Sequence, residues 1–201
     1  IASVSSDGLT LTLTKAAKFA HVGGVFVPNG VAGGRTQLGA VVALLTRNIV
    51  LQGNLADDSD TYGGHMVVSA VEINQDGLKV DRIGSVDINN VEFRNFGKQG
   101  MEHPSVYFKY LKYFSDDTNP TNIVEKSSFS YSFNYGLVTE MTSGLTINNN
   151  VFHRTFRTAV DVFENVKQIS LTNNAIIGNY HSPDDADALF SRPFGGFYIN
   201  A

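Results

Sequence analysis

Hydrophobic and polar residues alternate along the chain in short runs. The clearest run follows the Asp7-Gly8 pair, where Leu and Thr alternate strictly over residues 9–14. A period of two residues is typical of a half-buried β-strand. Short β-branched runs follow at residues 41–45 and 48–51, and no segment keeps a helical period over ten residues. The pattern therefore predicts an all-β chain of many short strands.

A repeat in the second half of the chain predicts the architecture. Each copy has an aliphatic residue first, then polar residues that are chiefly Asn or Ser, and Phe or Ile five places after the first. A repeat with a period of about 23 residues predicts coils that stack in register around one apolar interior, which is a β-solenoid. The four copies are residues 88–93, 124–129, 147–152 and 171–176.

The first interval between copies is longer than the other two, which indicates one coil with an inserted loop. We place this loop near residues 103–121, where Pro104, Pro120 and the Asp116-Asp117 pair interrupt the pattern. A β-sandwich with coincidental spacing is the alternative fold, but a sandwich gives no reason to repeat Asn-Asn before the aromatic residue. The predicted organisation is a single β-helix segment over 1–201, with N-terminal coils and Gly-rich loops in 1–80 and regular Asn/Phe coils in 81–201.

Composition narrows the classes of function. The chain is 42% hydrophobic and 17% charged, which predicts a folded core. A net charge of -4 without a basic stripe argues against a nucleic-acid partner. Apolar runs fall far short of the roughly 20 residues that a membrane-spanning helix needs, and the lack of Cys excludes disulfides and thiolate metal sites. Because the chain begins at Ile1 without a leader, we expect a segment of a larger protein.

Several stretches, taken in order, resemble the region after the G8 domain in the fibrocystin, fibrocystin-L, CEMIP and TMEM2 group. The most specific is the Leu-Leu-Thr-Arg-Asn-Ile run at 44–49, and the resemblance extends over about residues 3–180. It implies a right-handed parallel β-helix in an extracellular or cell-surface protein. The stretches are residues 3–12, 18–21, 42–53, 63–65 and 91–97.

The CEMIP and TMEM2 branch of this group is associated with breakdown of hyaluronan, and its β-helix carries a set of histidines. At the positions that match them, this chain has Tyr, Lys, Ser, Glu and Thr. These residue types do not replace a histidine cluster that binds a metal or transfers protons near neutral pH. The resemblance therefore favours the fibrocystin-L branch and a non-enzymatic role. The positions compared lie within residues 106–109, 130–134, 140–145 and 157–158.

The remaining titratable residues give weak candidates for a site. A pair of carboxylates could cleave a polysaccharide, and Glu140, Asp161 and Glu164 could share one face, although acidic residues on such a face are more often only solvated. No two histidines have the spacing that would place them on one strand or helix face, so we predict neither a metal nor a cofactor. We expect His21 and His65 to be packed, and His103 and His153 to lie at the surface; the fifth histidine is His181.

Aromatic residues gather in the expected inserted loop. Tyr107, Tyr110 and Tyr113 could stack on sugar rings or contact another protein, and they could equally cover the flank of the solenoid. Both interpretations stay open, and the three tyrosines are the candidate ligand-binding residues.

Taken together, these features predict a non-enzymatic structural module of an extracellular or cell-surface protein, a rigid rod in a ciliary or surface coat or a filament. Its expected partners are other chains or domains of the surface assembly, with glycans as a further class. The alternatives are a polysaccharide-degrading, hyaluronidase-like enzyme of the CEMIP type and a carbohydrate-binding adhesive β-helix.

Overall fold

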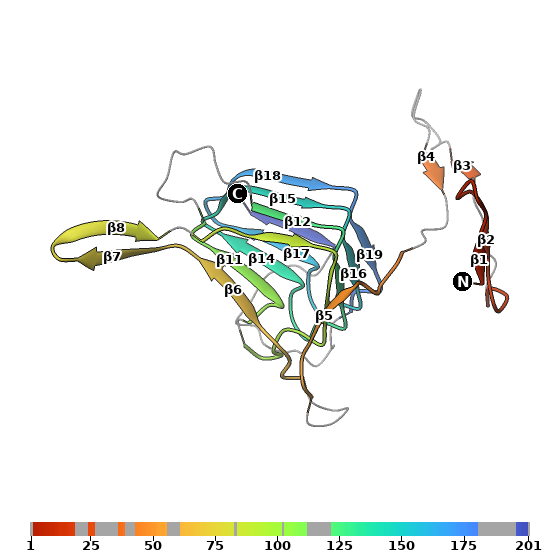
Figure 1. Ribbon diagram of the computed structural model, residues 1–201, viewed down its shortest axis with the longest axis horizontal. Helices are drawn as coiled ribbons and strands as arrows, with labels where there is room; N and C mark the ends of the chain where they lie inside the picture. The colour runs from red at the N-terminus through yellow and green to blue at the C-terminus, as the bar shows by residue number, and fades with distance from the viewer. Residues whose placement is uncertain are drawn as a thin grey trace. The chain divides into compact units, whose positions relative to one another are not determined.

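The computed structural model describes residues 2–18, 24–26, 36–38, 43–55, 61–82, 84–101, 103–111, 122–180 and 196–200. Contacts within the chain divide it into two compact units, residues 1–42 and 43–201. Every regular element in the described ranges is a β-strand (Figure 1). No helix among these residues is long and apolar enough to cross a membrane.

The first unit contains two short antiparallel pairs. β1 (Ser3–Val4) pairs with β2 (Leu11–Thr12), and β3 (Gly24–Phe26) pairs with β4 (Thr36–Leu38). The half-buried strand predicted from the Leu/Thr alternation is wrong in its burial, because the leucines of this run are exposed, at 40% to 85%. Alternation gives the strand its period, but burial also needs a partner surface.

The second unit is built from three parallel sheets, which wind into a parallel β-helix as the repeat predicts. The first sheet contains, in spatial order, β19 (Ala175–Ile177), β16 (Val151–His153), β13 (Ser128–Ser130), β10 (Val91–Arg94) and β5 (Ile49–Gln52). The second contains β20 (Phe197–Asn200), β17 (Val160–Phe163), β14 (Leu137–Glu140), β11 (Val106–Lys109) and β6 (Met66–Ser69). The third contains β18 (Lys167–Thr172), β15 (Ser143–Asn148), β12 (Asn122–Glu125) and β9 (Asp87–Asn89).

An antiparallel hairpin interrupts the winding. β7 (Val71–Gln75) pairs with β8 (Leu78–Arg82), and the two strands extend beyond the stacked coils in Figure 1. The tight turn between them has left-handed backbone at Asp76 (φ 55°) and Gly77 (φ 81°). This geometry suits a hairpin between twisted strands and favours an Asp-Gly pair.

The register of the sheets confirms the predicted repeat. The first positions of the four copies pair across coils, Ile88 with Val124, Val124 with Ile147 and Ile147 with Leu171. The last positions also pair, in the order Phe93, Phe129, Phe152 and Ile176. The sequence period is therefore one turn of the coil.

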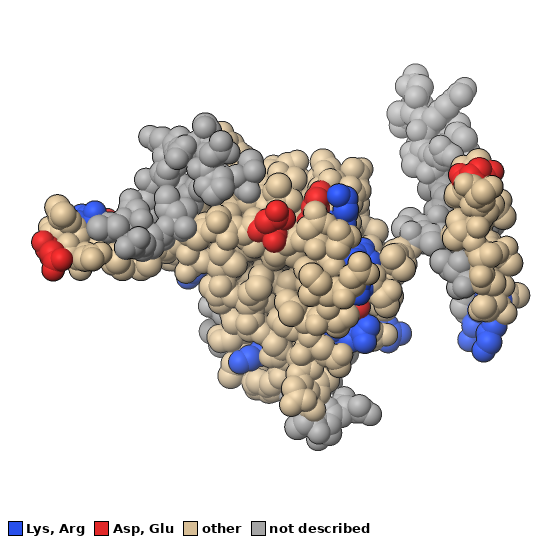
Figure 2. Space-filling model, in the orientation of Figure 1, with Lys and Arg blue, Asp and Glu red and all other residues tan. Residues whose placement is uncertain are grey.

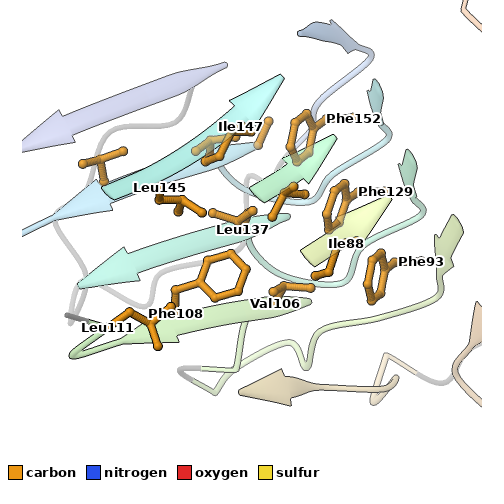
Figure 3. Packing of buried hydrophobic residues seen from close by; sticks show 14 residues of the cluster. Ile88, Phe93, Val106, Phe108, Leu111, Phe129, Leu137, Leu145, Ile147 and Phe152 are labelled. Atoms are coloured by element: carbon orange, nitrogen blue, oxygen red, sulfur yellow. The ribbon is translucent and has the colours of Figure 1, made fainter. Parts of the chain in front are cut away.

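Stacked phenylalanines form the centre of the core. The rings of Phe93 and Phe129 stack 5.0 Å apart, and those of Phe129 and Phe152 stack 4.7 Å apart (Figure 3). All three side chains are almost fully buried. Because each coil repeats the previous one, side chains of the same type lie above one another in successive coils. The burial of their apolar area is the main contribution to stability.

Asparagines hold the corner between the third and first sheets. Asn90, Lys126, Asn149 and Asn173 have left-handed backbone, with φ between 49° and 57°. Asn adopts this conformation more readily than most residues. The repeated Asn therefore follows from the backbone geometry of the corner.

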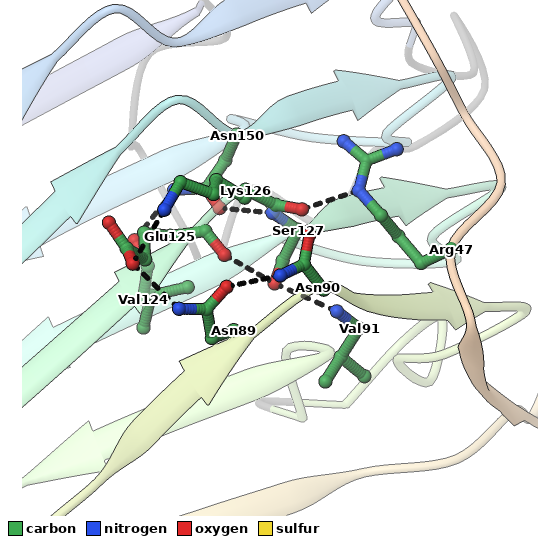
Figure 4. Close-up of polar contacts among 9 residues, drawn as sticks. All are labelled: Arg47, Asn89, Asn90, Val91, Val124, Glu125, Lys126, Ser127 and Asn150. Atoms are coloured by element: carbon green, nitrogen blue, oxygen red, sulfur yellow. Dashed lines mark hydrogen bonds and ion pairs between the residues drawn. The ribbon is translucent and has the colours of Figure 1, made fainter.

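A ladder of side-chain hydrogen bonds links successive corners. The N–H of Val91 donates to Ser127 Oγ (3.1 Å), that of Ser127 to Asn150 Oδ1 (2.9 Å), and that of Asn150 to Asn174 Oδ1 (3.0 Å). Asn150 Nδ2 also donates to the carbonyl of Val124 at 2.8 Å (Figure 4). These bonds satisfy backbone donors where the chain leaves one sheet for the next.

The inserted loop predicted at 103–121 is wrong in its first half. Residues 106–109 form β11, which pairs with both β6 and β14. Val106, Phe108 and Leu111 are fully buried in the core. The extra residues of this coil therefore fall on both sides of β11. The prediction missed this strand because the alternation within Val-Tyr-Phe-Lys is too short to distinguish a strand from a loop in the sequence alone.

The predicted division of the chain at residue 80 stays a prediction. β5 and β6 already pair with the regular coils, so stacking begins before residue 81.

Candidate functional site

Three of the residues predicted for a site, Tyr107, Glu140 and Asp161, lie on the outer face of the second sheet. Side chains alternate between the two faces of a strand. Val106 and Phe108 point into the core, so Tyr107 and Lys109 point outward. In the neighbouring strand, Glu140 is aligned with Lys109.

These three outward side chains form a closed polar group. The Tyr107 hydroxyl donates a hydrogen bond to Glu140 Oε2, and Lys109 Nζ lies 3.4 Å from the same oxygen. Burial lowers the pKa of Lys109, but the charge and hydrogen bond of Glu140, with a contribution from Tyr110, outweigh it, so the pKa of Lys109 is raised. Lys109 Nζ also lies 5.5 Å from the ring centre of Tyr107. Glu140 is thus a paired carboxylate.

The other two candidate carboxylates have different surroundings. Asp161 is aligned with Val138 in the same sheet and is 0% exposed. Glu164 lies just after β17, exposed, with φ 43°. A pair of carboxylates must flank one glycosidic bond to cleave it. One paired, one buried and one exposed carboxylate do not make an evident pair, and the catalytic assignment stays a prediction.

The predicted ligand-binding tyrosines do not form one loop. Tyr107 lies in β11, and Tyr110 follows that strand with φ 62°. Both are partly buried. Tyr113 lies outside the described residues. Stacking of these tyrosines on sugars stays a prediction.

The described histidines pack against other rings. His65 Nδ1 donates to the carbonyl of Pro104 at 2.5 Å, as expected for a packed histidine, and burial lowers the pKa of His65. His103, expected at the surface, is partly buried with its ring 4.7 Å from that of His65. His153, also expected at the surface, is partly buried, with its ring perpendicular to that of Tyr131 and the ring centres 5.4 Å apart. No group of three or more His, Asp or Glu residues in the described ranges could hold a metal ion; His21 and His181 lie outside them.

A cleft on the outer face of the first sheet was not predicted. Residues 44–47 cross this face just before β5. Ser128 Oγ donates to the carbonyl of Leu45, and Arg47 Nε donates to the carbonyl of Lys126 (Figure 4). A cleft of about 460 Å³ lies beside this segment. Its lining residues are Leu45, Thr46, Glu92, Arg94, Asn95, Ser130 and Tyr131.

Glu92 is a buried carboxylate in this cleft. It is 1% exposed, and its Oε1 accepts hydrogen bonds from Arg94 Nε (2.8 Å) and Ser130 Oγ (3.4 Å). Arg94 Nη2 lies 2.5 Å from the same oxygen. The second oxygen, Oε2, is buried and accepts no hydrogen bond from any residue in the described ranges. The two residues share a face because they lie two apart in one strand.

The charge of Glu92 also reaches the crossing segment. Burial lowers the pKa of Arg47, and the negative charge of Glu92 opposes that shift. Several Lys and Arg side chains gather near β5, β16 and β19 on the face shown in Figure 2. The cleft therefore combines one buried anion with neighbouring cations.

Comparison with known proteins agrees with the architecture. The family model of the CEMIP beta-helix matches residues 61–160. Human "Cell surface hyaluronidase CEMIP2" is 29% identical over 126 residues, which is 56% of this chain and 8% of that protein. Human fibrocystin-L is 23% identical over 174 residues, which is 84% of this chain and 4% of that protein. No solved structure matches the chain.

The fold thus defines the chain as a parallel β-helix protein. The resemblance to the fibrocystin and CEMIP group is confirmed, and the chain carries a β-helix related to those of CEMIP2 and fibrocystin-L. It spans less than a tenth of either relative.

Five of the positions at which the resemblance places histidines lie in two groups in the structure. Tyr107, Lys109 and Glu140 form the closed polar group. Ser130 and Tyr131 line the cleft. The cleft could have been suspected from the sequence, because the most specific run of the resemblance and the Glu-Phe-Arg-Asn stretch at 92–95 supply its other residues. The contact between these two stretches joins distant parts of the chain, so the sequence of neither stretch indicates it.

Proposed function

We propose that this chain is a structural module, a rigid β-helix scaffold within an extracellular or cell-surface protein. Its partners are other chains or domains of a surface assembly. The surface location is proposed from the similarity to the human cell surface hyaluronidase CEMIP2. The stacked coils, with one continuous core of repeated aromatic residues, support a rod-like role.

The observation that carries the non-enzymatic part is the state of Glu140. This carboxylate is aligned with the histidine-bearing positions of the resemblance, yet it is held by both Tyr107 and Lys109. A carboxylate whose oxygen is already engaged by a tyrosine hydroxyl and a lysine is less available to contact a substrate. The arrangement therefore favours a structural role for this face over a catalytic one.

The relation to CEMIP2 favours one second candidate, a hyaluronan-degrading enzyme. The two functions differ in one measurement. Hyaluronan of defined length is incubated with the chain, with and without calcium or zinc, and its size is followed by size-exclusion chromatography. We expect the polymer length to stay unchanged. Shortening that is lost in Glu140→Ala or Asp161→Ala would overturn the scaffold proposal.

A further inference from the structure

The β7–β8 hairpin is a two-stranded sheet with an exposed apolar face (Figure 1). Val71, Ile73 and Gln75 lie on one face of β7, and Leu78, which is aligned with Gln75, lies on the same face. Val71 is 51% exposed and Leu78 is 70% exposed. A two-stranded hairpin is only marginally stable in water, and three or more strands with a hydrophobic face are needed for independent stability. The hairpin therefore favours the addition of further strands.

The outer edge of β7 can accept another strand. No described strand pairs with this edge. Gln75 and Leu78 flank the two-residue turn, so they form a hydrogen-bonded pair. Hydrogen-bonded and non-hydrogen-bonded pairs alternate along an antiparallel ladder, so the backbone N–H and C=O groups of Glu72 and Asn74 point away from β8. These groups are the donors and acceptors that an added strand would use.

Charge distinguishes the edge of β7 from the edge of β8. The exposed Lys79 lies on β8, and a charged residue on an edge strand, lysine above all, opposes pairing with another chain. The single charged residue of β7 is Glu72, which lies 2.9 Å from Lys79 Nζ in an ion pair. β7 is therefore the edge that is better suited to pairing.

We propose that β7 pairs antiparallel with β7 of a second copy of this chain, around a two-fold axis at Ile73. Glu72 of each copy then lies opposite Asn74 of the other, and the two Ile73 side chains meet at the axis. Asn74 Oδ1 accepts from the N–H of Gly77 at 3.1 Å, so the amide of Asn74 keeps its donors for the Glu72 carboxylate of the second copy. The result is a four-stranded sheet with one continuous apolar face.

The other registers are less favourable. A shift by one residue would align apolar positions with polar ones. A shift by two residues would place Glu72 opposite either Glu72 or Asp76 of the second copy, and like charges directly opposite one another are destabilising. The register with Ile73 at the axis avoids both and is self-complementary, as a two-fold dimer requires. This contact is additional to the scaffold role and does not depend on it.

The whole chain is tested by sedimentation equilibrium over a wide range of protein concentration. Five residues from each copy make a contact below the ~1,200 Å² of stable interfaces, so we expect a weak equilibrium between monomer and dimer. Species larger than the dimer should not form, because β8 of each copy remains unpaired at the outside. A chain that stays monomeric at every concentration overturns the proposal.

Two proline variants show whether the dimer uses β7. Glu72→Pro removes one backbone N–H from the outer edge of β7 and should weaken the dimer at least tenfold. Lys79→Pro is the matched control, because Lys79 is aligned with Asn74 and its N–H faces the outer edge of β8. Both variants lose the same ion pair, yet Lys79→Pro should leave the dimer unchanged. Equal weakening by the two variants, or none by Glu72→Pro, overturns the proposal.

Two charge variants test the register and do not depend on proline. Asn74→Lys places opposite charges across the axis from each other and should tighten the dimer about twofold or more, whereas Asn74→Asp places like charges there and should weaken it by a similar factor. Asn74→Asp also keeps an acceptor for the N–H of Gly77. Affinities that change in the same direction in both variants, or in neither, contradict the pairing of Glu72 with Asn74.

Discussion

Two acidic residues on the outer faces of neighbouring sheets have opposite surroundings. Glu140 in β14 is met by a tyrosine hydroxyl and a lysine, and it is partly exposed. Glu92 in β10 is buried, and only one of its oxygens is engaged. Each carboxylate is engaged by side chains of its own sheet, and the two sheets differ further in what covers them. In the described part of the chain, residues 44–47 cross over the outer face of the first sheet, where they form one side of the cleft. A regular scaffold can thus carry a face with paired side chains and a face with a cleft.

The largest effect is expected from the core that both faces share. Phe129→Ala removes the central ring of the phenylalanine stack and should lower the free energy of unfolding by about 3–5 kcal/mol. Urea denaturation followed by circular dichroism measures it. Leu9→Ala, at an exposed residue of the first unit, is the control and should change stability little. A loss below about 1 kcal/mol would mean that the stack does not support the coils.

The second largest loss of stability is expected on the outer face of the first sheet, and it should exceed the loss on the outer face of the second sheet. Arg94→Ala leaves the buried Glu92 without its cation and should lower the free energy of unfolding by about 1–3 kcal/mol, less than for a fully buried pair because Arg94 is partly exposed. The same denaturation experiment applies. If Arg94→Ala and Glu92→Gln combined in one chain are no more stable than Arg94→Ala alone, an unpaired buried charge is not the cause.

A smaller loss of stability is expected from a substitution in the corner between the third and first sheets. Asn150→Ala removes the acceptor for the Ser127 N–H and the donor to the Val124 carbonyl, and should cost about 1–3 kcal/mol. Hydrogen exchange of the Ser127 amide reports the loss directly. Asn149→Ala in the same corner is exposed and serves for comparison, although its left-handed backbone adds some strain. Unchanged exchange at Ser127 would contradict the ladder.

The closed polar group of Tyr107, Lys109 and Glu140 should contribute least to the free energy of unfolding. Lys109→Met keeps the apolar stem of the side chain and removes the ion pair with Glu140, and we expect a loss of no more than about 1 kcal/mol because the lysine is partly exposed. Double-mutant analysis with Glu140→Gln isolates the pair. A coupling as large as that between Arg94 and Glu92 would remove the contrast between the two faces.

Acidification should act on the cleft more than on the closed group. Burial and, second, the charge of Arg154 lower the pKa of His153, which packs on Tyr131. A depressed histidine pKa gives stability that is present above the unfolded value of about 6.5 and is lost as the pH falls through the folded value. Between pH 7.5 and 5, His153→Gln should therefore lose less stability than the natural chain. Equal losses would exclude His153 as the source.

The sequence alone determined the fold of the coils. The period from Ile88 to Leu171, the aromatic position five places on and the Asn corners appear in the structure in register, because a solenoid turns each sequence period into one layer. It also identified His65 as a packed residue. These features depend on short-range pattern, which the sequence contains directly.

Tertiary structure decided the surroundings of the candidate sites. The sequence could not separate β11 from a loop, and it gave no sign that Tyr107 and Lys109 would meet Glu140 at the next coil. The sequence also did not indicate that residues 44–47 lie on the face that carries Glu92 and Tyr131. Such contacts depend on the lengths of the loops between strands, which set the register of distant segments without leaving a local pattern. The physical reason is that periodicity specifies which face a side chain takes, whereas only the folded chain specifies what lies opposite that face.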